Sequence, residues 1–313
     1  MTSISNTTPF AWLDVMGLAF VAWALATAVV AWRRTRPRQR ARRWGPWLLR
    51  VVALLAVLAA WFMLGWGLNY RRKPLTSRLD YDRSRVTEDR VRAMARAAVA
   101  ALNGGHTTAH AESWPNGSVL VARLAPAFAT ARRQLGLPSA VVPGRPKRTL
   151  LGAYFRAAGV AGFTNPWQLE VMLVPDALPF EQPALLAHEW AHLSGITGEA
   201  EAGFVGWLVC MNGDAQARYA GWLDVLPRLL AGLGADERRG VSALLAAGPR
   251  ADYAAIERRL AAVRPVVRDA AWAGYDRFLR ANRVESGVRD YDAVAQLLAG
   301  TAFDASWAPR LRR

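Results

Sequence analysis

The hydrophobic residues of this chain form two long uninterrupted runs near its beginning and a helical pattern after them. Residues 15–32 and 51–68 are 18-residue stretches without a charged side chain. With their apolar neighbours they extend to about residues 12–32 and 47–68, and a helix of that length crosses the roughly 30 Å hydrocarbon core of a bilayer. The pattern therefore predicts two transmembrane helices.

The surroundings of the two runs favour membrane spans over the alternatives. Trp12, Trp32 and Trp66 lie at the ends of the runs, as aromatic residues do at membrane interfaces. A cleaved signal peptide begins with basic residues, but residues 1–14 contain no Lys or Arg. Buried core helices of a soluble protein rarely enclose an arginine-rich segment such as residues 33–43.

The net positive charge is unevenly distributed along the chain, which changes the kind of partner that it predicts. The sequence has 40 Lys and Arg against 24 Asp and Glu, a net charge of +16, which would suggest a nucleic-acid partner. Of this excess, +11 lies in residues 1–79, whereas residues 80–313 carry only +5. The folded part therefore lacks the basic stripe of a nucleic-acid binder, and we expect the lipid bilayer, not nucleic acid, as a partner.

The same charges predict the orientation in the membrane. Residues 33–43 contain seven arginines, and nothing before them is basic. Basic loops remain in the cytoplasm, so the loop 33–46 is expected there, with the N-terminus and residues 80–313 on the extracytoplasmic side. The basic residues within 71–78 favour the reverse orientation but are fewer.

Beyond residue 80 the apolar residues recur mostly at helical spacing, and no run is long enough to span a membrane. Predicted helices cover residues 86–102, 119–135, 150–158, 219–233, 241–247, 253–263, 270–281 and 290–298. Residues 167–174 instead alternate apolar and polar side chains, which predicts a strand. The expected fold is mainly α with a small sheet (α+β). Residues 1–79 form the membrane anchor and residues 80–313 form one further domain.

One predicted helix carries residues suited to catalysis, and Pro183 and Gly195 are typical of its start and end. His188 and His192 are four residues apart, so both imidazoles project from one face and can bind one metal ion. Glu189 lies about 100° further round the helix, within reach of a water molecule at that ion. This HExxH spacing is typical of zinc hydrolases, in which the Glu acts as general base.

A zinc site of this kind needs a third protein ligand. Thr197 is placed to cap a second helix with Glu199 and Glu201 in its first turn, and a turn after the first helix would bring these carboxylates back to the histidines. The spacing leaves both as candidate metal ligands and favours Glu199. The alternative is that both simply stabilise the N-terminus of a helix.

The other candidate residues have structural interpretations. His106 and His110 follow an Asn-Gly-Gly sequence and have no HExxH-type Glu beside them, which predicts a solvated turn. The single cysteine, Cys210, excludes a disulfide framework and is expected to be a small buried residue in an apolar run.

Residues 66–75 read WGLNYRRKPL, residues 188–204 read HEWAHLSGITGEAEAGF and residues 290–298 read DYDAVAQLL. These segments resemble the landmarks of an uncharacterised bacterial family of integral-membrane proteins, a domain of unknown function. Members of that family have an HExxH…ExEAN core, and the family is similar in turn to gluzincin-type zinc metallopeptidases. The resemblance implies Zn²⁺ held by the two histidines and Glu199. The Asn of that core falls on Gly203 here, which keeps Glu201 open as the third ligand.

The resemblance also implies roles for two further features. In such enzymes an edge strand beside the cleft pairs with the extended substrate, and Leu169, Val171 and Leu173 of the predicted strand are the candidates here. Tyr219 is the candidate donor of a hydroxyl group to the tetrahedral oxyanion. A purely structural strand and a core tyrosine are the alternatives.

The sequence as a whole favours a two-pass protein of the bacterial inner membrane with an extracytoplasmic, zincin-like domain. The expected activity is Zn²⁺-dependent hydrolysis of peptides or proteins at the membrane surface, with Glu189 as general base. An inactive zincin-like scaffold that binds a partner is the alternative from another functional class. An intramembrane protease is disfavoured because acidic residues such as Glu181 and Glu199 flank the HExxH helix.

Overall fold

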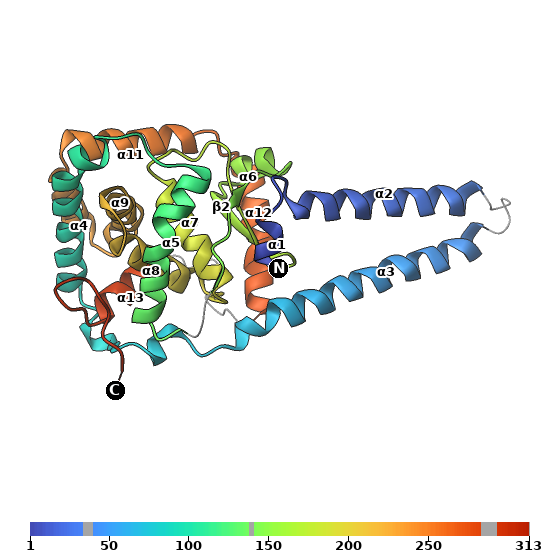
Figure 1. Cartoon of the computed structure of the whole chain (residues 1–313), viewed down its shortest axis with the longest axis horizontal. Helices are drawn as coiled ribbons and strands as arrows, with labels where there is room; N and C mark the ends of the chain where they lie inside the picture. Colours follow the sequence, from blue (N-terminus) through green and yellow to red (C-terminus); the bar gives the residue numbers. More distant parts are fainter. Residues whose placement is uncertain (34–39, 138–140, 283–292, 313) are drawn as a thin grey trace.

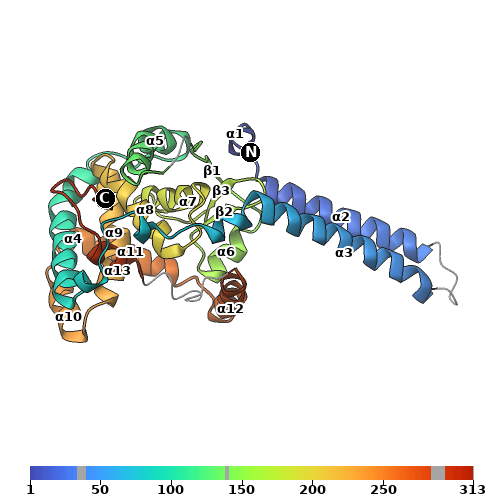
Figure 2. The same cartoon turned by 90° about the horizontal axis from the view of Figure 1, so that it is seen from below.

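A helical hairpin projects from a mostly helical domain in the computed structural model, which describes residues 1–33, 40–137, 141–282 and 293–312 (Figure 1). The hairpin consists of α2 (Trp12–Arg33) and α3 (Arg40–Gly65), which lie side by side in both views (Figure 2). Each contains a 22-residue segment that is long and apolar enough to cross a membrane and is not buried within the chain.

The two apolar helices that the sequence predicts are thus confirmed, and their crossing of a membrane stays a prediction. The second helix ends at Gly65, slightly before the predicted end at residue 68. Residues 34–39 of the predicted cytoplasmic loop lie outside the described residues, as do residues 290–292 of the last predicted helix.

A buried carboxylate joins the hairpin to the domain. Glu170 accepts hydrogen bonds from the backbone N–H groups of Trp12 (3.0 Å) and Leu13 (2.8 Å), at the start of α2. Lys147 Nζ lies 3.1 Å from Glu170 Oε2, and the two side chains are 3% and 0% exposed. Burial raises the pKa of Glu170, but these N–H groups, Asn165 and Lys147 outweigh it and lower the pKa overall. Glu170 therefore caps α2, whose first N–H groups have no partner within the helix.

The N-terminal residues also pack on the domain. Within α1 (Thr2–Ser5), Thr2 Oγ1 donates a hydrogen bond to the carbonyl of Leu169 (2.9 Å). Asn6 Nδ2 donates to the carbonyl of Pro143 (2.9 Å), and Asn6 Oδ1 accepts from the N–H of Arg145 (2.9 Å). The N-terminus and the domain therefore lie at the same end of the hairpin.

The domain is built from helices of unequal length, which confirms the mainly α fold with a small sheet. Three short 3₁₀ helices, η2 (Gly67–Arg71), η3 (Leu75–Ser77) and η4 (Arg83–Arg85), lead from the hairpin into the domain. The helices that follow are α4 (Glu88–Ala109), α5 (Gly117–Gln134), α6 (Gly152–Ala158), α7 (Gln182–Leu193), α8 (Glu199–Met211), α9 (Ala215–Ala231), α10 (Ala235–Ala243), α11 (Ala247–Leu260), α12 (Pro265–Ala281) and α13 (Val294–Gly300).

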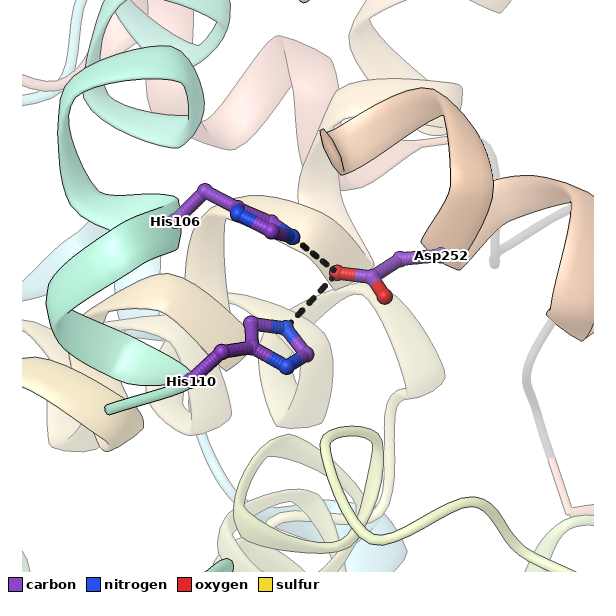
Figure 3. A group of neighbouring side chains, drawn as sticks. All are labelled: His106, His110 and Asp252. Carbon is purple, nitrogen blue, oxygen red and sulfur yellow. Dashed lines mark hydrogen bonds and ion pairs between the residues drawn. The ribbon is translucent and has the colours of Figure 1, made fainter. Parts of the chain in front are cut away.

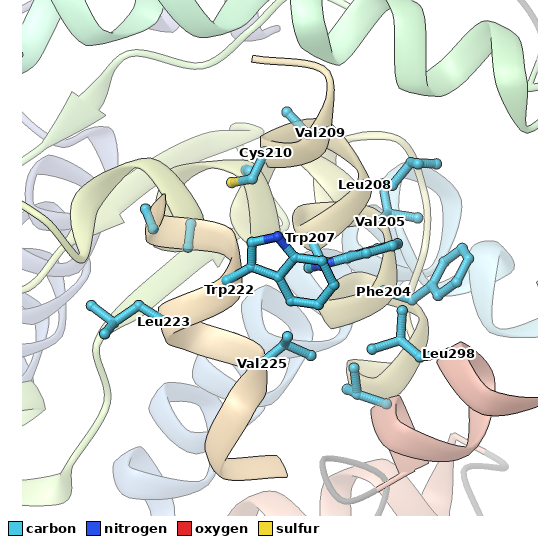
Figure 4. Packing of buried hydrophobic residues seen from close by; sticks show 14 of the residues in the cluster. Phe204, Val205, Trp207, Leu208, Val209, Cys210, Trp222, Leu223, Val225 and Leu298 are labelled. Atoms are coloured by element: carbon cyan, nitrogen blue, oxygen red, sulfur yellow. The ribbon is translucent and has the colours of Figure 1, made fainter. Parts of the chain in front are cut away.

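Helix α8 forms the centre of the core, with α5, α7, α9 and α13 packed around it. Every residue from Ala202 to Cys210 is buried. Trp207 packs edge-on against Trp222 of α9, with ring centroids 5.4 Å apart (Figure 4). Cys210 is buried, as predicted, and its burial raises the pKa of the thiol.

Helix α4 continues seven residues beyond its predicted end at residue 102 and includes Gly104, Gly105, His106 and Ala109. A glycine inside a helix costs only about 1 kcal/mol. The packing of α4 along α9, the most extensive helix contact in the described chain, outweighs that cost. The predicted solvated turn at His106 and His110 is therefore wrong, because both imidazoles project from one helical end.

The sheet has three strands in the order β1–β3–β2: β1 (Pro146–Lys147), β2 (Gly162–Asn165) and β3 (Glu170–Leu173). Strand β3 is paired on both sides, parallel to β1 and antiparallel to β2. The predicted edge strand at residues 167–174 is therefore wrong, since alternation does not distinguish an edge from a centre. Leu169 lies in the turn before β3 and has φ of 52°. Val171 and Leu173 lie in β3 itself, and both are buried.

Candidate metal centre

The helix that carries the HExxH sequence begins and ends where the sequence predicts. Pro183 lies in the first turn of α7, and the helix ends at Leu193. Gly195 follows with φ of 77°, a left-handed conformation that favours glycine. A Cβ at Gly195 would also collide with Arg72 and Asn69. This turn folds the chain back so that the start of α8 faces α7.

The turn brings two imidazoles and one carboxylate together. His188 Nε2 lies 3.1 Å from Glu199 Oε2, His192 Nε2 lies 3.5 Å from the same oxygen, and the two Nε2 atoms are 3.2 Å apart. Three tetrahedral ligands at zinc bonds of about 2.0–2.1 Å would lie about 3.3 Å from one another. The three atoms thus have the mutual spacing that a zinc ion requires.

Two hydrogen bonds orient these side chains. His192 Nδ1 lies 2.7 Å from the carbonyl of Ile196, to which it can only donate, so its Nε2 lone pair is left for an ion. Tyr275 of α12 donates its hydroxyl to Glu199 Oε1, and Oε2 faces the histidines. Partners of this kind hold metal ligands in place in zinc sites. The sequence offered no signal for Tyr275, because it lies 76 residues after Glu199.

The electrostatics of the cluster suit a cation. Burial raises the pKa of Glu199, but the histidines outweigh it and hold the pKa well below its ordinary value. Burial lowers the pKa of His192, yet the neighbouring Glu199 charge raises it overall to about 9. A buried carboxylate that stays ionised attracts positive charge to this position, whether a proton or a metal ion.

Glu189 is adjacent to the cluster without belonging to it. Its Oε2 accepts a hydrogen bond from the hydroxyl of Thr164 in β2 (2.7 Å), and the residue is 5% exposed. A Cβ on Gly162 of the same strand would lie 2.5 Å from Glu189 Oε1, so the absent side chain makes room for the carboxylate. Burial raises the pKa of Glu189 above its ordinary value.

Of the two carboxylates that the sequence leaves open, only Glu199 reaches the histidines. Glu201 Oε1 accepts a hydrogen bond from the N–H of Leu75 (2.6 Å), at the start of η3. The prediction of Glu201 as a metal ligand is therefore wrong. The reason is that two residues along a helix correspond to a rotation of about 200°.

Gly203, at the position of the expected Asn, packs on α13. A Cβ there would lie 2.8 Å from a methyl group of Val294, so any larger residue would require that side chain to shift. In the described chain, the carbonyl of Ile196 orients His192, and Tyr275 orients Glu199.

Tyr219 is not near this cluster's ligands, contrary to its predicted role as oxyanion donor. Its hydroxyl donates to Asp252 Oδ2 of α11 (2.5 Å), beside His106 and His110. The spacing of Tyr219 from the HExxH sequence does not show which way its side chain points. In the structure, α9 packs on α4, and Tyr219 faces Asp252 of α11.

The candidate metal centre lies where the hairpin meets the domain. The ring of Trp66, directly after α3, is 6.4 Å from that of His192. Tyr275 stacks on Phe278, and Phe278 packs against Phe62 of α3 with ring centroids 5.8 Å apart. The end of α3 therefore forms part of the wall of the site.

A family model described as Protein of unknown function (DUF3810) matches residues 1–299. No curated protein and no solved structure matches the chain.

Proposed function

Since the chain belongs to the DUF3810 family, whose activity is unknown, we propose from its own residues that it is a membrane-anchored zinc metallopeptidase. The observation that carries the proposal is the cluster of His188, His192 and Glu199, whose ligand atoms have tetrahedral spacing beside the buried Glu189. Two imidazoles and a carboxylate with one open position are the ligand set of catalytic zinc sites.

The proposed roles follow from the contacts of each side chain. Zinc, when bound, would polarise a substrate carbonyl and make water a stronger nucleophile at neutral pH. Glu189 would accept a proton from water and deliver it to the leaving amine, a role suited to a carboxylate with a raised pKa. Thr164 fixes the direction of this carboxylate, and Tyr275 positions Glu199.

The substrate-binding strand is proposed to be β2 rather than β3. Strand β2 lies at an edge of the three-stranded sheet, and Thr164 within it contacts Glu189 directly. An extended peptide paired with this edge would run past the metal centre, with main-chain hydrogen bonds providing affinity.

We propose that the substrates are peptides or proteins at the membrane surface. The two apolar helices would anchor the chain in a bacterial inner membrane, with the arginine-rich loop in the cytoplasm and the domain outside. The N-terminal residues pack on the domain, as a two-pass topology requires. The contacts of Trp66 and Phe62 support this proposal, because they lie between the candidate metal centre and the end of α3 that joins the domain.

Removal of zinc is the direct test. Full-length protein in detergent is expected to cleave a peptide library, to lose at least 90% of this activity after chelation, and to regain it with Zn²⁺. His188→Ala, which removes a ligand, should remain inactive under the same reconstitution. Cleavage that persists in fully chelated protein would overturn the proposal. Zinc-loaded protein that cleaves no peptide would favour the scaffold alternative.

Gly162→Ala is expected to lower the rate about 100-fold, with little effect on bound zinc. The new methyl group would push the Glu189 carboxylate aside, and a shift of about 1 Å at a reacting group costs this much. Gly240→Ala makes the same change in α10, where a Cβ meets open space, and should be active. Equal kcat values for the two variants would contradict the placement of Glu189 against β2.

A further inference from the structure

The other two histidines of the chain form a second cluster, on helices other than the HExxH helix. His106 and His110 project from the last turn of α4 toward Asp252 of α11 (Figure 3). Asp252 Oδ2 lies 3.0 Å from His110 Nε2 and 3.7 Å from His106 Nε2. The three ligand atoms lie within 4.8 Å of one another.

This cluster has the same ligand types as the first. Each consists of two histidines four residues apart in sequence and one carboxylate from another helix. The distances of 3.0 and 3.7 Å lie on either side of the spacing of about 3.3 Å for tetrahedral ligands of zinc. The two imidazole rings are stacked, with centroids 4.4 Å apart, and the Nε2 atom of each lies within 4 Å of the same oxygen, Asp252 Oδ2.

The surroundings hold the three side chains in this arrangement. Tyr219 donates its hydroxyl to Asp252 Oδ2 at 2.5 Å, the kind of outer contact that orients a ligating carboxylate. Gly248 of α11 lies against the ring of His106, where a Cβ would be 2.6 Å from ring atoms. Trp114 packs edge-on against His110, with ring centroids 5.4 Å apart.

The cluster is also accessible. The side chains of His106 and His110 are 27% and 29% exposed, whereas that of Asp252 is 9% exposed. An ion can therefore enter from solvent and keep water in its remaining position. Zn²⁺ and related first-row divalent ions favour two neutral imidazoles with a carboxylate, whereas Ca²⁺ and Mg²⁺ prefer oxygen ligands alone.

We propose that His106, His110 and Asp252 bind a second Zn²⁺-like ion, separate from the HExxH centre, which links the end of α4 to α11. Tyr219 is a positioning residue of this site. The ion would join α4, which precedes α9 in the chain, to α11, which follows it. Such a link between distant segments would stabilise the folded domain.

The test is a Co²⁺ and Zn²⁺ titration of chelated full-length protein in detergent, read by visible absorption and metal content. Wild-type protein is expected to bind two ions per chain. The double variant His188→Ala/His192→Ala should bind one, and adding Asp252→Asn should remove it. In the double variant, Zn²⁺ at about 100-fold above Kd should raise Tm by about 5–10 °C, and this rise should disappear with Asp252→Asn.

Conservative substitutions protect the test against misfolding. Asp252→Asn keeps the shape and an oxygen acceptor for Tyr219, and His106→Gln changes a side chain that is 27% exposed. Tyr219→Phe should weaken the second site about 10-fold without changing its stoichiometry. The inference would be overturned if the double variant bound no ion. It would also be overturned if that variant still bound one ion after Asp252→Asn and after His106→Gln.

The same titration separates this inference from the proposed function. If wild-type protein binds one ion and only His188→Ala abolishes it, the proposed peptidase centre is supported and the second site is overturned. A single ion lost with Asp252→Asn alone supports the second site and contradicts zinc at the HExxH centre.

Discussion

Glu189→Gln is expected to lower kcat for peptide hydrolysis about 10²–10⁴-fold while bound zinc stays at the wild-type level. The amide of Gln cannot accept a proton at neutral pH, but it fits the space beside Gly162 and still accepts the Thr164 hydrogen bond. Because Glu189 is not among the three grouped ligands, metal affinity should not depend on it. The measurements are single-turnover cleavage rates and zinc content on the same sample.

The two carboxylates of α8 supply matched controls. Glu201→Gln retains an oxygen acceptor for the N–H of Leu75, so activity and zinc content are expected to stay near wild type. Glu199→Gln removes a ligand charge and should release zinc. A Glu189→Gln enzyme that cleaves at the wild-type rate would rule out this residue as general base.

Glu170→Gln is expected to destabilise the folded protein by about 3–5 kcal/mol, because Lys147 is left as a buried charge without its partner. The N-terminus of α2 also loses the negative charge that caps it. Thermal unfolding in detergent should show Tm lowered by about 10 °C. Activity at low temperature should change less than stability, since the described hydrogen bonds of Glu170 go to residues outside the candidate metal centre.

The pH dependence and a second substitution check this assignment. The folded-state pKa of Glu170 is lowered, so its contribution is present above its ordinary pKa of 4.5 and is lost as the pH falls through the folded value. The difference between wild type and variant should therefore shrink in acid. Lys147→Met, combined with Glu170→Gln, should restore part of the stability. Asp236→Asn, in an exposed ion pair, should have little effect, and a loss as large as that of Glu170→Gln would contradict the argument.

The features that sequence analysis predicted correctly are those fixed by local geometry. The two apolar helices follow from length and composition, and α7 follows from Pro183, the His spacing and Gly195. The preference for Glu199 over Glu201 agrees with the structure because helix geometry places them on different faces.

The features it missed depend on contacts between distant segments. Tyr275 contacts Glu199, and Gly162 makes room for Glu189, both from other elements and without a recognisable spacing. The central position of β3 depends on the two-residue strand β1, which carries almost no pattern. At His106, local glycine signals were outweighed by the packing of α4 on α9.

The distribution of histidine has a practical consequence for spectroscopy. The sequence contains four histidines, and the structure places two in each cluster. In protein labelled only at histidine, every imidazole NMR signal therefore originates from one of these two places, without background from the remaining chain. The tautomer of each ring, and its response to an added ion, can then be observed directly in the whole membrane-anchored molecule.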